Sequence, residues 1–225
     1  MAGIQDFVEF CEDFLGPQTM LTAPVGSDQW DVVVTTTAGT PTYTVGGVNG
    51  ELSIDLDTND ESEIVTVYQS DILNYDIDLL DHIEFRVKMA QAAVGATTEL
   101  AFGMTSARND VIDTIAEAAL FRVVGADSTT AVVVETDDGS AGNAKDDIAT
   151  GVTLINAYKK FVISFSHGTS DVRFYIDGVR VAASTTFDMS TYTAGLQPMI
   201  QLQKPSGAAG DGVVVDYLRI VSRRA

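Results

Sequence analysis

The stretch VRFYIDGVRVAAS, residues 172–184, predicts a β-hairpin. Val172, Phe174 and Ile176 occupy alternate positions, which is the period-two pattern of a strand with one buried face. Asp177 and Gly178 follow directly, and this dipeptide readily takes the two positive-φ positions of a type I′ turn. A second short strand then completes the hairpin, so the question becomes how many strands of this kind the chain contains.

Strand patterns recur along most of the sequence. In HIEFRVKMA, residues 82–90, apolar side chains alternate with Glu84, Arg86 and Lys88, so this charged row is expected on the solvent face. The other expected strands are residues 30–37, 51–56, 63–69, 98–104, 119–125, 130–136, 160–166, 199–204 and 212–221. Glycine-rich and Asp-rich turns separate them. Many short strands of this kind predict an all-β sandwich of two antiparallel sheets, in one domain spanning residues 1–225.

Alternation also predicts which side chains lie between the two sheets. The expected core residues are Phe161, Ile163, Phe165, Phe174, Ile176, Leu218 and Ile220. Two segments remain ambiguous, because apolar residues at 108–120 and at 1–16 fit a helix as well as a strand.

The charge balance excludes one class of partner. Thirty-two acidic residues face 13 basic ones, which gives a net charge of −19. Such a surface repels phosphate backbones, so nucleic-acid binding is not expected. The end of the chain differs, because Arg223 and Arg224 form a basic tail at residues 222–225, with Arg219 just before it.

Membrane insertion and export signals are not expected either. No run of about 18 apolar residues occurs, which argues against a transmembrane helix. The first residues carry acids where a secretory signal would carry basic residues. Cys11 is the single cysteine, so no internal disulfide can form.

EDFLG at residues 12–16, followed by Trp30 and a strand, resembles the opening of concanavalin A-like (laminin G-like) jelly rolls. The strands in the second half of the chain resemble the later strands of that family. The resemblance implies a jelly roll in which a strand or arm at residues 1–16 pairs beside the closing strand. GGVNGEL (46–52) and FRVK (85–88) resemble segments of jelly-roll structural proteins from tailed bacteriophages, which implies a virion protein such as a capsid decoration protein.

Catalysis is not expected from the motifs present. Glycoside hydrolases with the concanavalin A-like fold carry an E-x-D-x-x-E strand, whose acids flank the glycosidic bond. This chain has no such strand, no G-x-S-x-G motif, and only two histidines, His82 and His167. The sequence therefore predicts no catalytic residues and a protein that is not an enzyme.

One acidic stretch is a candidate for a metal site. In DLDTNDESE, residues 55–63, the side chains of Asp55, Asp57, Asn59 and Glu61 stand at alternate positions and offer the hard oxygen ligands that Ca²⁺ prefers. The spacing departs from an EF-hand loop, since Asp60 replaces its glycine. The sequence thus predicts no cofactor, with calcium as the one metal candidate and a solvated acidic loop as the alternative.

Three function classes remain. The first is a structural protein on the capsid surface of a virion, which binds the major capsid protein or another virion protein and its own copies. The expected contact residues are Phe7, Phe10, Phe14, Arg219, Arg223 and Arg224. The alternative to this contact role is a monomer whose N-terminal aromatics pack in its own core. The second class is a lectin-like module that binds a glycan for host attachment, and the third is a hydrolase.

Overall fold

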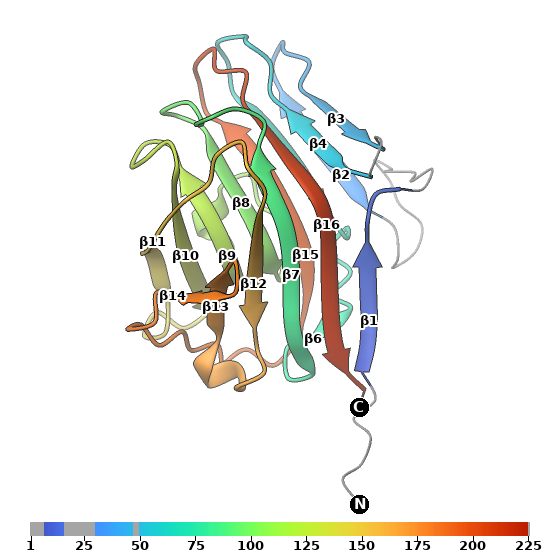
Figure 1. Cartoon of the computed structure of the whole chain (residues 1–225), viewed down its shortest axis with the longest axis vertical. Helices are drawn as coiled ribbons and strands as arrows, with labels where there is room; N and C mark the ends of the chain where they lie inside the picture. The colour runs from blue at the N-terminus through green and yellow to red at the C-terminus, as the bar shows by residue number, and fades with distance from the viewer. Residues whose placement is uncertain (1–6, 16–29, 47–49, 225) are drawn as a thin grey trace, which may run out of the picture.

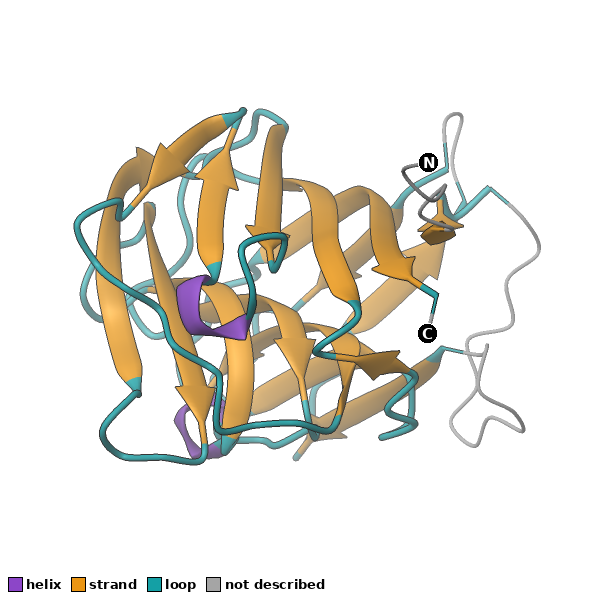
Figure 2. Cartoon of the chain, turned by 90° about the horizontal axis from the view of Figure 1, so that it is seen from below, coloured by secondary structure: helices purple, strands orange, loops and turns teal. Residues whose placement is uncertain are grey.

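The computed structural model describes residues 7–15, 30–46 and 50–224, which form two β-sheets packed face to face (Figures 1 and 2). These residues contain two short 3₁₀ turns, η1 (Ile112–Thr114) and η2 (Thr169–Asp171). No helix in this part of the chain is long and apolar enough to cross a membrane. The predicted all-β sandwich of two antiparallel sheets is confirmed.

Sheet A contains the first and the last described strands of the chain. Its order is β14 (Val179–Val181), β13 (Arg173–Ile176), β12 (Lys159–Ser164), β7 (Leu80–Met89), β16 (Gly212–Arg223), β4 (Leu52–Asp55) and β3 (Thr42–Val45). β1 (Phe7–Glu12) pairs with the second half of β16, and the two run side by side in Figure 1. The N-terminal segment is therefore a strand beside the closing strand, as the resemblance implied.

Sheet B lies behind sheet A in Figure 1. Its order is β11 (Lys145–Thr153), β10 (Ala131–Asp138), β9 (Glu117–Val124), β8 (Glu99–Thr105), β15 (Gly195–Lys204), β5 (Glu63–Tyr68) and β2 (Asp31–Thr36), and β6 (Tyr75–Asp76) pairs with the start of β15. Each pairing in it is antiparallel.

The core between the sheets is built around aromatic side chains. Phe102 and Phe121 of sheet B contact Phe161 of sheet A, and further contacts continue from Phe121 to Phe174 and on to Phe187. These ring centroids lie 4.9–5.2 Å apart in edge-to-face arrangements, which suit the quadrupoles of aromatic rings. The seven predicted core residues are at most 3% exposed, so that prediction is confirmed.

The hairpin at residues 172–184 forms as predicted. Asp177 and Gly178 have φ values of 51° and 80°, the positive values of a type I′ turn. The resulting register places Ile176 opposite Val179. The Asp177 carboxylate also accepts hydrogen bonds from the Lys160 backbone N–H at 2.9 Å and from Lys159 Nζ at 3.0 Å, so the turn is tied to β12.

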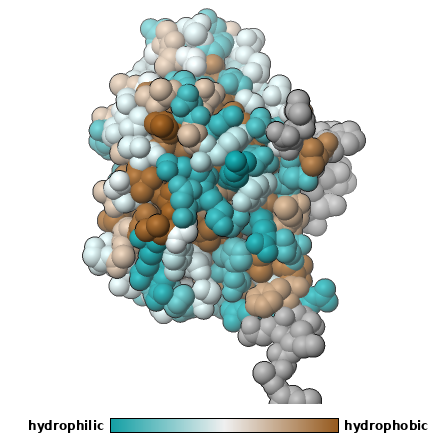
Figure 3. Space-filling view, viewed as in Figure 1, coloured by the Kyte–Doolittle hydropathy of each residue, from teal (hydrophilic) through white to brown (hydrophobic). Residues whose placement is uncertain are grey.

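The outer face of sheet A is largely covered by hydrophilic side chains (Figure 3). Glu84 of β7 accepts a hydrogen bond from the Tyr217 hydroxyl at 2.5 Å and pairs with Lys160 at 3.2 Å. The Arg86 guanidinium lies 4.2 Å from the ring centroid of Tyr158. The charged row of β7 is therefore a cross-strand-paired solvent face, as its alternation predicted.

Two parts of the chain differ from the expected elements. Residues 108–120 fitted a helix, yet they contain only η1 before β9 begins at Glu117. Pairing with both β8 and β10 satisfies the backbone of β9, and this outweighs a weak local helical pattern. Three strands had no clear sequence signal: β3 and β6 are short, and β11 is a largely exposed edge strand.

Candidate functional site

The outer face of sheet B, which points away from the core, carries a second layer of chain. The segment at residues 106–116 connects β8 to β9 and folds back over this face. Its Ile112 and Ile115 are only 2% and 5% exposed, because they pack on the sheet. The cluster they complete consists of Tyr68, Ala101, Ile112, Ile115, Ala118, Leu120 and Met199. This packing holds the polar residues beside the segment in fixed positions.

A row of polar side chains crosses the same face from β5 to β9. Thr66 Oγ1 donates to Gln201 Oε1 at 2.8 Å, and Gln201 Nε2 donates to Gln203 Oε1 at 2.7 Å. Gln203 Nε2 in turn donates to Glu99 Oε2 at 2.7 Å, and that oxygen lies 3.9 Å from Arg122 Nη2. We call these five residues the polar row. Each amide fixes the orientation of the next, so the row presents preorganised donors and acceptors.

Arg122 ends the polar row and gathers carboxylates around it. Its side chain is only 2% exposed, and its Nη1 lies 2.5 Å from both Glu135 Oε2 and Asp113 Oδ1. Asp147 and Asp146 lie 3.6 and 3.8 Å from the same nitrogen. With Glu99 of the polar row, five carboxylates therefore lie within 4 Å of one buried cation, and the cluster carries excess negative charge when all five are ionised.

Burial, together with the neighbouring charges, changes the proton affinities in the cluster. Burial raises the pKa of Glu135 to about 7, although the Arg122 guanidinium acts in the opposite direction. Burial also raises the pKa of Asp147. Burial opposes the ionisation of Arg122, but its ion pairs, with Glu135 first, outweigh that effect and raise its pKa. Arg122 thus stays charged, while the Glu135 carboxyl exchanges its proton near neutral pH.

Two cavities open onto the surface on either side of Ile112 and Asp113. The first, about 190 Å³, is lined by Glu135, Lys145 and Asp146 among others. The second, about 320 Å³, is lined by Ile64, Val111 and Pro205 together with Glu99, Gln203 and Asp113. The polar row and the Arg122 cluster therefore reach solvent through two adjoining hollows with mixed polar and apolar walls.

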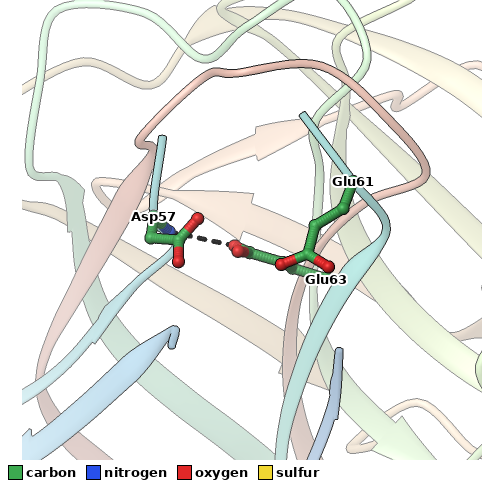
Figure 4. Close-up of side chains that lie close together, drawn as sticks. All are labelled: Asp57, Glu61 and Glu63. Atoms are coloured by element: carbon green, nitrogen blue, oxygen red, sulfur yellow. Dashed lines mark hydrogen bonds between the residues drawn. The ribbon is translucent and has the colours of Figure 1, made fainter. Parts of the chain in front are cut away.

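Among the described residues, two groups of three carboxylates have oxygens close enough together to contact one metal ion. Asp113, Glu135 and Asp146 have oxygens within 4.8 Å of one another, but Arg122 already supplies their counter-charge. The second group is Asp57, Glu61 and Glu63, which converge at one end of the sandwich (Figure 4).

The calcium residues expected from the sequence are only partly brought together. Asp57 and Glu61 belong to the second group, with Glu63 as the third member. Asp55 instead accepts a hydrogen bond from the Ser53 hydroxyl at 2.8 Å, and Asn59 donates its side-chain amide to Asp57 at 3.1 Å. The alternate spacing fails as a guide because the chain bends after β4 and leaves its strand geometry.

The aromatic contact residues expected at the N-terminus divide into two groups. Phe7 is 45% exposed and Phe10 is half-buried on β1. Phe14 is fully buried against Trp30, with ring centroids 6.4 Å apart, so its assignment as a partner contact is wrong. Phe14 has a left-handed backbone conformation, with φ of 53°. This conformation turns its side chain into the core just after β1 ends.

The C-terminal arginines are also engaged within the chain. Arg219 Nε donates to Glu9 at 2.7 Å, and Arg223 Nη2 donates to the Asp78 carbonyl at 2.8 Å. Residues 222 and 223 belong to β16, so the first half of the expected basic tail is strand, and Arg224 beyond it is exposed.

The two histidines do not form a triad. His82 Nδ1 lies 2.6 Å from Asp81, near the start of β7. His167 lies 3.1 Å from the Ser166 hydroxyl, but its other ring nitrogen contacts Arg173 at 2.7 Å, where a triad would require an acid.

Comparisons with known proteins identify the fold. No protein-family model matches the sequence, and no curated protein matches it significantly. Among solved structures, the laminarinase from Rhodothermus marinus matches over 100% of both chains at 11% identity and a TM-score of 0.64. A glycoside hydrolase family 16 endo-glucanase from Bacteroides ovatus matches over 94% of this chain and 99% of its own, at 12% identity and a TM-score of 0.61. The carbohydrate recognition domain of Emp46p matches over 86% of this chain and 88% of its own, at 10% identity and a TM-score of 0.53.

These likenesses confirm the concanavalin A-like jelly roll and correct one expectation. The prediction that the chain is not an enzyme is overturned, because glycoside hydrolases share this fold over nearly the whole chain. The absence of an E-x-D-x-x-E strand excludes one arrangement of catalytic acids and leaves others open. The similar structures named above also do not extend the resemblance to virion proteins.

Most of the polar residues on the outer face of sheet B are not predicted by any local sequence pattern. Glu99, Arg122, Glu135 and Gln203 lie on four different strands and share no local motif. A signal was present, since Arg122 and Glu135 each interrupt an apolar strand, and a charge there needs a partner when it is buried.

Proposed function

We propose that this protein binds a glycan at the outer face of sheet B, in the two adjoining cavities beside Ile112 and Asp113. The observation that supports the proposal is the polar row, whose Glu99 and Gln203 line the second cavity. The row ends in the Arg122 cluster, whose Glu135 and Asp146 line the first cavity. A ligand there would meet side chains that are already oriented, so little conformational entropy would be lost on binding.

The chemistry of the walls suits a neutral sugar chain. Carboxylates of Glu99, Asp113 and Glu135 accept hydrogen bonds from hydroxyl groups, and the Gln203 amide can donate and accept. Apolar walls at Val111 and Pro205 can pack on the C–H faces of sugar rings. The net charge of −19 disfavours acidic polysaccharides. Laminarinases and a carbohydrate recognition domain share the fold, and this supports a glucan as the first ligand class to test.

Isothermal titration calorimetry with laminarin and mixed-linkage β-glucan oligosaccharides tests the proposal. We expect Glu99→Gln and Gln203→Ala to weaken binding about tenfold each, because each loses one preorganised hydrogen bond worth roughly 1.5 kcal/mol. The matched control is Glu9→Gln, the same chemical change on the exposed edge of sheet A, which should leave binding unchanged.

Reducing-sugar release from the same glucans is measured in parallel. Release that Glu135→Gln abolishes would show that the Arg122 cluster also acts on the bound glycan, while binding without release would indicate recognition alone. A protein that binds none of these glycans, or binds equally well in every variant, contradicts the proposal.

A second candidate function is attachment to a larger assembly such as a bacteriophage capsid. The exposed edge and side chains of β1 favour it. Within the described residues β1 pairs only with β16, and its Phe7 and Val8 are 45% and 46% exposed. A hollow of about 230 Å³, lined in part by Val8, Phe10 and Ile220, lies beside it. Exposed strand edges readily pair with another chain. Light scattering of the intact protein and of Phe7→Ser tests this: a homo-oligomer that the variant dissociates supports it, and a monomer in both contradicts it.

A further inference from the structure

The segment at residues 106–116, which we call the strap, separates the two cavities on the outer face of sheet B. Ile112 and Asp113 belong to the walls of both cavities, which measure about 190 and 320 Å³. The strap packs on an apolar floor, to which β9 contributes Leu120 and β15 contributes Met199, and both of these side chains are fully buried. The strap therefore divides what would otherwise be one larger hollow.

Hydrogen bonds in the middle of the strap connect strap residues to one another. The Asn109 side chain accepts a hydrogen bond from the Val111 backbone N–H at 2.9 Å. In the turn η1, the Thr114 N–H donates to the Val111 carbonyl at 3.1 Å, and the Ile115 N–H donates to the Ile112 carbonyl at 3.0 Å. These bonds would persist if the strap moved as a unit, so lifting it from the sheet breaks none of them.

The two ends of the strap are anchored separately from its middle. The Ser106 backbone N–H donates to the Glu117 carbonyl at 2.9 Å, and the Ser106 hydroxyl donates to the Glu117 carboxylate at 2.6 Å. The Arg108 backbone N–H donates to Asp71 Oδ1 at 2.9 Å. Hinges are often formed by a few residues at the ends of elements, so these anchored ends can serve as hinges for the middle of the strap.

The middle of the strap is held on the sheet by two apolar side chains and an ion pair. Ile112 and Ile115 are buried in the cluster on the outer face, whereas Val111 beside them is 53% exposed. Asp113 Oδ1 lies 2.5 Å from Arg122 Nη1. This contact is small compared with the core between the two sheets, so the strap should open locally without unfolding of the sandwich.

The ion pair can be released at low cost because Arg122 has other partners. Its Nη1 also lies 2.5 Å from Glu135 Oε2, so Arg122 remains paired when Asp113 leaves. The Asp113 side chain is already 63% exposed, and it gains further hydration on leaving. Asp146 has an oxygen within 4.8 Å of Asp113, and the repulsion between these two carboxylates is relieved when the strap opens.

We propose that the strap opens and closes over the outer face of sheet B, with the Asp113–Arg122 ion pair as its latch. The open strap joins the two cavities into one groove with Leu120 and Met199 as its floor. The closed strap covers that floor and limits the access of a ligand to it. The inference rests on the proposed function for the identity of that ligand, but the motion is measured without glycan, so either can fail alone.

Cysteine labelling with DTNB, in a Cys11→Ser background that removes the single native thiol, measures the opening. Leu120→Cys places a thiol under the strap, and Val123→Cys places one on the same strand but between the two sheets. Both native side chains are fully buried. We expect Leu120→Cys to react at least about tenfold faster than Val123→Cys, because labelling under the strap needs only local opening and labelling in the core needs unfolding of the sandwich.

Asp113→Asn weakens the latch and should speed the labelling of Leu120→Cys about tenfold without affecting that of Val123→Cys. Asp110→Asn is the matched control, because Asp110 pairs with Arg108 inside the strap and should leave both rates unchanged. Equal labelling rates of the two cysteines would show that the strap opens only on unfolding, and this would overturn the proposal. So would equal acceleration by Asp113→Asn and Asp110→Asn. If Leu120→Cys does not fold, Ala118→Cys in the same cluster decides between these outcomes.

Discussion

Arg122 and Glu135 show how a single buried charge organises its surroundings. Arg122 alternates with core residues of β9, so the strand aims it at the outer face of sheet B. There the segment at residues 106–116 covers it, and it can remain charged only because carboxylates from three other elements reach it. Removing one member of a buried ion pair typically costs about 3–5 kcal/mol, so Arg122 is a structural requirement of the site as well as a part of it.

The proton affinity of Glu135 leads to a prediction about pH. Its pKa is raised from an ordinary 4.5 to about 7, so between these values the folded protein binds more protons than the unfolded chain. The free energy of unfolding should therefore fall as pH rises through this window. Glu135→Gln removes this dependence. As pH rises from 5 to 7, the free energy of unfolding of the variant should therefore rise by about 1–3 kcal/mol relative to that of wild type, as measured by urea denaturation.

Glu9→Gln serves as the control for this pH effect. Its hydrogen bond to Arg219 lowers the pKa of Glu9, so it titrates below the window and its difference from wild type should stay constant. If the difference in free energy of unfolding between Glu135→Gln and wild type is also constant from pH 5 to pH 7, Glu135 does not exchange its proton in that range.

At the residue scale, the sequence shows which side chains can donate oxygen ligands, but it does not show which of them lie close together in the fold. Asp57 and Glu61 were recognisable as hard oxygen donors, whereas Glu63 lay at an apparent strand start. The convergence depends on the bend after β4 and on Lys204, whose Nζ lies 3.5 Å from Glu63 although it is 141 positions beyond Glu63 in the printed sequence. Local spacing contains no information about such long-range neighbours.

At the element scale, the β13–β14 hairpin depends on its turn. Gly178 has a φ of 80°, and a Cβ placed on it would meet nothing within 4 Å. Any cost of adding a side chain therefore comes from the backbone conformation alone. The hairpin continues the register of β12, where Phe161 pairs with Ile176, so the turn positions one edge of the core.

Gly178→Ala should lower the free energy of unfolding by about 1–2 kcal/mol, which is the cost of a left-handed conformation for a residue with a Cβ. Gly178→Asn should cost less, since Asn tolerates that conformation. Gly142→Ala is the matched control, because Gly142 also has open space around it but no positive φ. Chemical denaturation of the three variants measures the effect, and equal stabilities of Gly178→Ala and Gly142→Ala would contradict it.

Strands with one buried face were predictable because alternation is a strictly local pattern. The hairpin, β7 and β12 all follow from it, and so does the core between them. The segment before β9 was not predictable in the same way. Its Ile112 and Ile115 pack on the outer face of a sheet, so their spacing reflects a surface that other strands provide. β11 escaped notice for a related reason, because an edge strand needs no apolar face.

At the scale of the whole molecule, the net charge of −19 sets opposing electrostatic effects against each other. Repulsion among carboxylates destabilises the compact state, while ion pairs such as Arg219–Glu9 at 2.7 Å and Lys159–Asp177 at 3.0 Å stabilise it. Exposed ion pairs are individually worth little, typically below about 1 kcal/mol. Acidic residues outnumber basic ones by 32 to 13, so repulsion should dominate.

Added salt should therefore stabilise this protein. Raising NaCl from about 10 mM to about 500 mM shortens the screening length from roughly 30 Å to roughly 4 Å, which weakens the widely spaced repulsions more than the close pairs. We expect Tm at pH 7 to rise by several degrees, and KCl to act as NaCl does, since screening depends on charge and not on ion identity. The scans are run with EDTA present, so that trace calcium does not contribute. A Tm that falls with salt would show that the surface ion pairs outweigh the repulsion, and a response to NaCl but not to KCl would show specific binding of sodium.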